Sequence, residues 1–585
     1  MQLQEDQKNL VLAIVLSVVI LFGFEFIYGF FAPPPPPVQE TAPQTQTSPQ
    51  ATGTGPAVTP GAPNPDAPPV PGGATTVPAV GADRDAALAS GTRIKVTSPR
   101  LTGSIALNGG RIDDLTLTDY RVSLEPDSEQ IVLFSPNLYY ADFGWLAADP
   151  GMPVPGLQAK WRADGTELTP EKPVTLSWTN DRGLTFSRTI ALDANYMFTV
   201  TQQVRNDGGD PVDLYGYGLI SRYELPEITG FYILHEGPYG VFDGTLKEID
   251  YDDLMEDEQE AQSATGGWIG ITDKYWLATL IADQSQKVDS RFSYTTVNGT
   301  DKFQVDMKSG LLSVPAGGSV ALETHLFAGA KEVSLLEGYG EALGIDRFDL
   351  AIDWGYLYFL TKPIFHGIEY FNDLLGNFGL AILLLTVIIK LIFFPLANKS
   401  YRAMTKMKKL QPEMVELKER YSDDKQRMQK ELMELYKKEK VNPMSGCLPI
   451  LVQIPVFFAL YKVLFVTIEM RHAPFYGWVQ DLSAPDPTSL LNLFGLIPYS
   501  LPEPMLIGIW PIIMGATMWL QQKLNPPPAD PTQAKVMMFL PFFFTLLLAR
   551  FPAGLVIYWT WNNVLSIAQQ WVIMHKAGVK IGGGT

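Results

Sequence analysis

Long apolar runs alternate with polar segments along this 585-residue chain. The first run, residues 10–31, contains a single charged residue, Glu25. A helix of about 20 residues is long enough to cross the hydrocarbon core of a bilayer. The first run is too long for the core of a cleaved signal peptide and predicts an uncleaved signal anchor in residues 1–32. Five more runs predict spans at 378–396, about 448–467, about 505–522, 536–551 and 553–574. The pattern therefore predicts a polytopic α-helical core with six transmembrane helices in all.

Between the first and second apolar runs the pattern changes to short alternating segments, which is typical of β-strands. Asn108-Gly109 separates two such segments and is a strong hairpin signal, and further turns are expected at 180–183 and 193–195. Residues 91–345 are therefore predicted to fold as a large, all-β antiparallel sandwich. The acidic segment 247–261 is expected to be a solvated loop.

The remaining segments connect these parts. Residues 33–90 hold fifteen prolines among Ala, Gly, Thr and Gln, a composition that predicts an extended, mobile tether without a specific ligand. Residues 346–377 mix aromatic and charged side chains, which favours an amphipathic helix at the membrane interface. Residues 398–440 show Leu, Met and Tyr at helical spacing and predict a hairpin of two amphipathic helices, the first kinked at Pro412. Residues 576–585 form a short tail.

Charge is unevenly distributed along the chain. Residues 91–345 contain 19 Lys and Arg against 37 Asp and Glu, which accounts for the whole net charge of −18. Such an acidic domain argues against nucleic-acid binding there. The five histidines show no metal-ligand spacing, and Cys447 is the single cysteine. No phosphate-binding glycine loop is present in the sequence, so neither a metal nor a nucleotide cofactor is expected.

The number of Lys and Arg residues in each loop predicts how the protein is oriented in the membrane. Segment 398–440 carries 13 Lys and Arg, whereas the loops on the opposite side carry few. Because basic loops stay in the cytoplasm, both termini and segment 398–440 are predicted to be cytoplasmic. Residues 33–377 are then periplasmic, and the protein is a multi-pass protein of the bacterial inner membrane.

Polar side chains within the apolar runs are candidates for function. Lys390 lies inside the run 378–396, one helical turn from Thr386 and on the same face. Burying an ammonium in lipid costs about 2.5–3.5 kcal/mol on the mildest scale, so such a lysine is a functional candidate. The alternative is that Lys390 snorkels to the nearby interface. Gln453, Asn562 and Asn563 also need partners away from lipid; interhelical hydrogen bonds explain any one of them without a function.

The motifs KLQPEM, KEKVNP, GCLPILVQIPVFFALY, APF, DLSAPDP and FPAGLVIYWTWNN occur in this order. On these motifs the chain resembles the bacterial YidC-type membrane protein insertases, in the Gram-negative form with a large periplasmic domain. The resemblance extends through GGWIGITDKYWLA in the β region and so covers essentially the whole chain. It implies that 91–345 is a periplasmic β-supersandwich. It also implies that 378–575 is a five-helix core with a hydrophilic groove, open to cytoplasm and lipid and closed outside.

The resemblance also implies which residues meet the substrate. Lys390 matches a basic groove residue of the family, although many Gram-negative members have arginine there; lysine keeps the charge but lacks the planar fork of donors. Tyr558 matches a substrate-contacting tyrosine, and Trp559 stands where a second tyrosine is usual. The groove residues expected from the resemblance and from the polar positions are Lys390, Thr386, Gln453, Tyr558, Trp559 and Asn562.

The implied function is insertion of nascent inner-membrane proteins, without covalent catalysis, catalytic residues, a cofactor or a small-molecule substrate. The expected partners are nascent membrane proteins, the lipid bilayer, a Sec translocon and the translating ribosome. A basic partner-binding surface is expected on the hairpin at Lys406, Lys408, Lys409, Arg420, Lys425 and Arg427. The alternatives are a polytopic small-molecule transporter or lipid scramblase, which would more often show internal repeats, and a membrane-anchored carbohydrate enzyme using His235 and Glu236.

Overall fold

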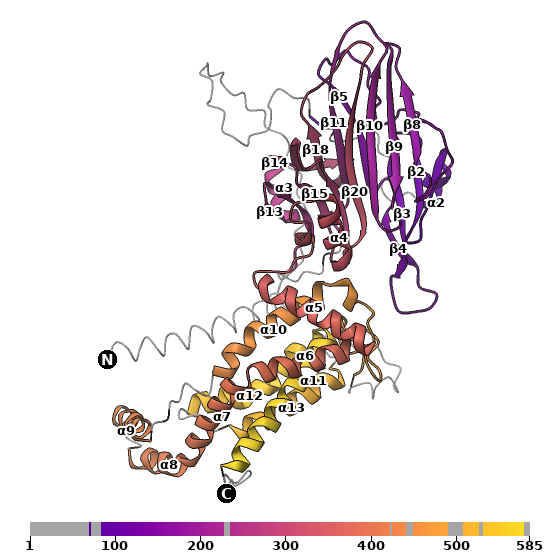
Figure 1. Ribbon diagram of the computed structural model, residues 1–585. Coiled ribbons are helices and arrows are strands. Elements are labelled where there is room, and N and C mark those ends of the chain that lie inside the picture. The colour runs from indigo at the N-terminus through magenta and orange to yellow at the C-terminus, as the bar shows by residue number, and fades with distance from the viewer. Residues whose placement is uncertain are drawn as a thin grey trace, which may run out of the picture. The chain divides into compact units, whose positions relative to one another are not determined.

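A computed structural model describes residues 69–71, 84–226, 228, 234–421, 424–439, 441, 448–489, 507–525 and 531–577. The described residues form a large β-sandwich followed by a helical region (Figure 1). This agrees with the predicted order of an all-β domain and an all-α core. The predicted signal anchor and most of the tether and tail lie outside the described residues.

The β domain consists of two sheets packed on a common apolar core. The first sheet has eleven strands in the order β14-β17-β18-β11-β5-β3-β2-β1-β7, with β19 beside β11 and β4 beside β3. Its strands are β1 (Arg93–Thr97), β2 (Leu101–Ala106), β3 (Ile112–Arg121), β4 (Gln130–Phe134), β5 (Tyr139–Ala147), β7 (Glu167–Leu168), β11 (Val212–Tyr223), β14 (Gln259–Thr265), β17 (Lys287–Val297), β18 (Thr300–Ser309) and β19 (Leu312–Val314).

The second sheet has nine strands in the order β13-β12-β15-β16-β20-β10-β9-β8-β6. These are β6 (Arg162–Ala163), β8 (Val174–Thr179), β9 (Leu184–Leu192), β10 (Met197–Asn206), β12 (Gly237–Phe242), β13 (Thr245–Glu248), β15 (Trp268–Thr272), β16 (Trp276–Ile281) and β20 (Ser319–Ala330). Most neighbouring strands are antiparallel. Strict alternation of buried and half-buried residues along β9 shows how one face of each strand reaches the core.

The turn signals in the sequence are confirmed. Residues 107–111 connect β2 to β3, and Gly109 adopts a φ of +82°, which a residue with a Cβ rarely tolerates. The expectation of a solvated acidic loop at 247–261 is wrong. Helix α3 (Tyr251–Asp257) and strand β14 form there, because the side chains of Tyr251 and Leu254 are buried in the core and anchor the segment.

Part of the predicted tether is attached to the β domain. Residues 69–71 lie against the first sheet, with the side chain of Val70 buried. Helix α2 (Arg84–Ala89) follows, and Arg84 forms a salt bridge with Asp114. The sequence prediction of a tether without a specific contact is therefore wrong for these residues.

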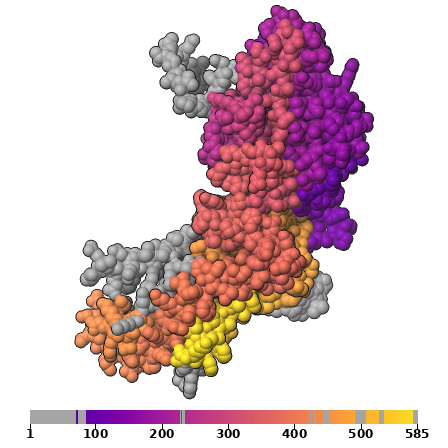
Figure 2. Space-filling model, in the orientation of Figure 1, coloured from indigo at the N-terminus to yellow at the C-terminus, as the bar shows by residue number. Residues whose placement is uncertain are grey.

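The helical region contains α4 (Val333–Leu343), η1 (Phe348–Ala351), α5 (Tyr358–Leu375), α6 (Phe378–Ile392), α7 (Phe394–Lys409), α8 (Gln411–Arg420), α9 (Lys425–Lys438), α10 (Leu448–Val466), η3 (Ile468–Met470), α11 (Ile509–Leu524), α12 (Pro531–Leu547), η5 (Leu548–Arg550) and α13 (Ala553–Lys576). Helix α13 packs against α11, α6, α7 and α10. It forms one side of the helical region in the space-filling view, where it is yellow (Figure 2). Helix α5 lies within the segment predicted to be interfacial and carries exposed aromatic residues, Tyr358, Phe359 and Tyr370.

Among the described residues, no single helix has both the length and the apolar composition needed to cross a bilayer by itself. Helices α6 and α7 together meet both conditions, with a bend of 69° between them. The predicted span 378–396 is thus interrupted at Phe393. Pro395 explains the break, because its ring cannot donate a hydrogen bond and clashes with the carbonyl four residues earlier.

The basic segment 398–440 forms three helices. Helix α7 ends at Lys409, and α8 begins with Pro412 in its first turn, so the predicted kink at Pro412 is a break between two helices. The Asp424 side chain accepts a hydrogen bond from the Arg427 amide (3.0 Å) and caps α9. Helices α8 and α9 pack through Met414, Leu432, Leu435 and Tyr436.

Candidate functional site: a polar cavity between α6, α10 and α13

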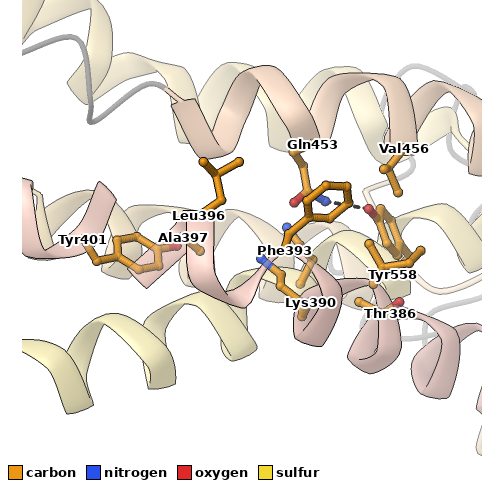
Figure 3. A pocket seen from close by; sticks show the side chains of 11 residues that line it. Thr386, Lys390, Phe393, Leu396, Ala397, Tyr401, Gln453, Val456 and Tyr558 are labelled. Atoms are coloured by element: carbon orange, nitrogen blue, oxygen red, sulfur yellow. Dashed lines mark hydrogen bonds between the residues drawn. The ribbon is translucent and has the colours of Figure 1, made fainter. Parts of the chain in front are cut away.

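A small open cavity of about 40 Å³ lies where α6, α7, α10 and α13 meet (Figure 3). Its volume suits about three water molecules or one polar side-chain group, not a whole helix. It is lined by Thr386, Ile389, Lys390, Phe393, Leu396, Ala397, Tyr401, Gln453, Val456, Tyr558 and Asn562. Five of the six groove residues predicted from the sequence are among them.

Lys390 supplies the positive charge of this cavity. Its ammonium donates a hydrogen bond to the Ser566 hydroxyl of α13 (2.7 Å). The residue lies in the last turn of α6, where the partial negative charge of the helix C-terminus favours a cation. None of the residues lining the cavity is acidic. Lys390 is therefore held by a hydroxyl group and a helix end rather than by a carboxylate.

A side-chain hydrogen bond connects two of the predicted groove residues across the cavity. The Gln453 amide on α10 donates to the Tyr558 hydroxyl on α13 (2.5 Å), as the dashed line in Figure 3 shows. Gln453 lies two residues before Pro455, within α10. The buried Tyr558 ring fills the space next to Lys390 and Thr386. This bond fixes the wall of the cavity opposite α6.

Thr386 and Asn562 complete the polar lining. The buried Thr386 hydroxyl donates to the Ile382 carbonyl of its own helix (2.7 Å), so it keeps acceptor lone pairs. The Asn562 side-chain oxygen is buried and accepts no hydrogen bond from the described part of the protein. Among the described residues, the cavity therefore contains an acceptor without a donor, the Asn562 oxygen, and a cation, the Lys390 ammonium. Together they suit a polar group that has both donors and acceptors.

Two polar residues of the apolar runs lie elsewhere. Trp559 does not line the cavity; its ring packs against Phe457 and Phe544 on α10 and α12. Lys462, at the other end of α10, forms an ion pair with Asp353 (2.7 Å).

The remaining amides of α13 make interhelical bonds. Asn563 donates to Thr517 (3.1 Å) and Gln570 to Asn525 (3.0 Å), both from α13 to the α11 segment. These bonds attach α13 to its neighbour, which is the structural role expected for most such amides.

Sequence reasoning missed two residues of the site. Ser566 is fully buried and is the partner of Lys390, and Tyr401 in the middle of α7 lines the same cavity. Ser566 lies one turn after Asn562 on the same helical face, and this spacing was the available signal. Tyr401 lies beyond the predicted span and gave no such signal.

The predicted partner-binding cations belong to α7, α8 and α9. Lys406, Lys409, Arg420 and Arg427 are exposed. Lys408 is half-buried and donates to the Leu524 carbonyl (3.4 Å), and this burial lowers the pKa of Lys408. Lys425 is the first residue of α9. The structure thus exposes four of these six cations on the three consecutive helices α7, α8 and α9.

A larger cavity of about 1200 Å³ is lined partly by His235 and Glu236 of the β domain. Glu236 accepts a hydrogen bond from the Lys274 amide (3.0 Å), and the His235 ring is bonded to the Pro238 carbonyl (3.1 Å). Both side chains are thus held by hydrogen bonds to the backbone of the β domain. The described residues contain no cluster of His, Cys, Asp or Glu suited to a metal ion.

Comparisons with known proteins cover nearly the whole chain. Residues 370–580 match the family described as 60Kd inner membrane protein, and residues 93–366 match the YidC periplasmic domain. The chain is 48% identical over 599 residues to membrane protein insertase YidC of Methylorubrum extorquens, covering 98% of this chain and 96% of that protein. It is 49% identical over 584 residues to membrane protein insertase YidC of Rhizobium meliloti, covering 99% and 97%. A crystal structure of an active YidC insertase with its first transmembrane domain resolved matches 82% of this chain and 92% of that chain. Its sequence identity is 19% and its TM-score 0.36.

Proposed function

We propose a route by which this protein moves an incoming polypeptide into the bilayer. The chain belongs to the family of YidC membrane protein insertases and inserts proteins into the inner membrane. In this proposal the polar cavity between α6, α10 and α13 receives the polar flank of an incoming segment. The apolar part of that segment passes from there into lipid.

The energetics of insertion identify the step that needs help. Transfer of a 20-residue apolar segment into a bilayer yields on the order of 10 kcal/mol at about 0.5 kcal/mol per residue. The obstacle is the polar or charged flank, which must enter a region of low dielectric constant. A fixed cation inside that region lowers the cost for an acidic flank, and no nucleotide hydrolysis is required.

One observation carries the proposal: the single cation of the cavity has no carboxylate among the lining residues. An ammonium has three donors, and the bond to Ser566 uses one of them. Donors therefore remain for the carboxylate of an incoming chain, while Asn562 offers an acceptor for its amides. The cavity volume suits one side-chain group at a time, so the flank passes residue by residue.

The topology proposed here follows from charge. Six spans, with residues 1–32 as the anchor, place both termini and the hairpin α8–α9 in the cytoplasm. The β domain and α5 then lie in the periplasm. Lys390 is in the cytoplasmic half of its span under this topology, so the cavity is accessible to chains arriving from the cytoplasm.

Helices α7, α8 and α9 are proposed to receive the cytoplasmic partner. Their exposed cations match the phosphates of ribosomal RNA or of anionic lipid headgroups. A translating ribosome docked there would deliver nascent chain next to the cavity. Cooperation with a Sec translocon is part of the proposal for substrates with larger periplasmic domains.

The route is tested by photo-crosslinking from two matched aromatic positions. A photoreactive phenylalanine analogue at Phe393, which lines the cavity and is 37% exposed, is compared with one at Phe539 of α12, which is 58% exposed and lies outside the lining. Ribosome-bound chains with an acidic flank are expected to crosslink to position 393 and not to position 539. Equal crosslinking at both, or crosslinking at 539 alone, contradicts the route.

A further inference from the structure

The outer face of the first sheet carries a cluster that the insertion route does not use. Cross-strand partners share a face, and Gln304 of β18 pairs with Ser221 of β11, while Asp306 pairs with Arg291 of β17 and Leu219 of β11. The alternate residues of β18, Phe303, Val305 and Met307, point to the sandwich core. The Gln304 side therefore faces away from the core.

Although it faces outward, this side is buried. Lys302, Gln304, Asp306 and Leu219 are each 2% exposed. Residues 69–71 of the tether lie here, and the Val70 side chain is 4% exposed among Tyr140, Tyr217, Leu219 and Tyr223. We call the residues Tyr140, Tyr217, Leu219, Tyr223, Arg291 and Gln304 the tether site.

The polar half of the tether site offers hydrogen-bond donors only. Arg291 donates to the Val70 carbonyl (3.2 Å), and the Gln304 amide nitrogen donates to the Pro71 carbonyl (3.3 Å). Both donors are also held by one carboxylate, since Asp306 accepts from Arg291 (2.9 Å) and from Gln304 (3.0 Å).

The orientation of the Gln304 amide is fixed from its other end. Its oxygen accepts from the Ser221 hydroxyl (3.0 Å) and from the Lys302 ammonium (2.9 Å). With the oxygen occupied, the NH₂ group must face Asp306 and the tether. A donor preset by three buried partners, Ser221, Lys302 and Asp306, is expected of a recognition site rather than of a chance contact.

The tether segment matches this arrangement chemically. In Pro69-Val70-Pro71 both prolines lack an N–H, so the segment presents carbonyl acceptors and a single amide donor. Proline also restricts φ, which lowers the entropy lost when an extended segment is fixed on a surface. Val70 supplies the apolar side chain that the tyrosines enclose.

We propose that the tether site is a binding site for an extended apolar peptide flanked by prolines, and that Pro69–Pro71 of the same chain is its resident ligand. Attachment at this point divides the predicted tether. Segment 33–68 remains between the anchor and the site, and segment 72–92 remains between the site and β1. The inference is independent of the insertion route, because it concerns another face and another domain.

The first part of the test measures protection of Val70 in the full-length protein in nanodiscs. In a Cys447→Ser background, maleimide labelling of Val70→Cys is compared with labelling of Leu124→Cys, a β-domain residue that is 52% exposed. Labelling of Val70→Cys is expected to be at least about tenfold slower, because it requires local opening. Equal rates would overturn the proposal.

The second part tests recognition of a peptide in trans. The variant Pro69→Gly/Val70→Asp/Pro71→Gly empties the site without altering a strand. It is expected to bind a fluorescent peptide PDAPPVPGGAT, whereas the wild-type chain, whose own tether competes at high effective concentration, binds little. The same peptide with Val replaced by Asp serves as the control. Absence of binding to the emptied site, or equal binding of the control peptide, overturns the proposal.

Discussion

Removal of the Ser566 hydroxyl tests how the cation of the cavity is positioned. The Ser566 oxygen accepts from Lys390 (2.7 Å) and donates to the Asn562 carbonyl (2.8 Å), so its own hydrogen is committed and a lone pair faces the ammonium. Ser566→Ala deletes the acceptor with little change of volume at a fully buried position. The ammonium then loses the partner that holds it at the cavity and is free to snorkel toward the end of α6.

The size of the effect follows from the type of bond. A hydrogen bond to a charged group contributes about 1.5–3 kcal/mol, which corresponds to about a 10- to 150-fold change in the preference of the ammonium for this position. We expect insertion of a short single-span protein with an acidic flank to slow by about tenfold, the lower end of that range, because the charge itself is retained.

The assay is insertion into liposomes that contain the purified full-length protein, with protease protection of the inserted segment as the readout. Ser566→Thr keeps a hydroxyl and is expected to restore the rate. A substrate whose flanking Asp residues are replaced by Asn is expected to respond little to Ser566→Ala. If Ser566→Ala inserts the acidic-flank substrate as fast as wild type, the positioning role is wrong. A slowing of both substrates alike would indicate a purely structural role.

Three further predictions follow from the contacts described above. Tyr558→Phe leaves the Gln453 amide without its acceptor (2.5 Å) and is expected to slow insertion several-fold for acidic and neutral flanks alike; sensitivity confined to acidic flanks would contradict this role as a wall contact. Lys331→Met in the β domain is expected to raise thermal stability at pH 7, because burial lowers the pKa of Lys331 to about 8 from the ordinary 10.5. Between pH 8 and 10.5 the folded state therefore binds fewer protons than the unfolded state, and below pH 8 the charged lysine lowers the free energy of unfolding by on the order of 3 kcal/mol. The stability advantage of Lys331→Met should disappear as the pH approaches 10.5, which unfolding scans at several pH values would measure. Val70→Asp is expected to lower the midpoint of β-domain unfolding by a few degrees, because a carboxylate replaces a buried apolar side chain, whereas Leu124→Asp at an exposed position should leave it unchanged.

The sequence was most informative where the physical signal is local. Asn108-Gly109 predicts its turn because the turn needs a positive φ that glycine adopts freely. Lys390 and Thr386 could be placed on one helical face because their spacing of four residues is a property of any α-helix. The apolar runs likewise identified α6, α10, α11, α12 and α13 from composition alone.

Features that depend on tertiary neighbours were missed. Ser566 is an ordinary helical serine until α6 places Lys390 beside it. The attachment of Val70 depends on tyrosines that lie on β5 and β11, far away in sequence. Composition alone describes the tether as unable to form a core, which is correct, but it does not show that the β domain provides the missing apolar surface.

The central claim is that the charge of Lys390 inside the polar cavity promotes insertion. The most direct measurement compares insertion of a short, acidic-tailed single-span protein into liposomes carrying wild type, Lys390→Ala or Lys390→Arg. We predict that wild type and Lys390→Arg insert the substrate and that Lys390→Ala does not, because arginine retains the charge and alanine removes it. Equal insertion by all three proteins would contradict the claim and leave Lys390 as a snorkelling residue.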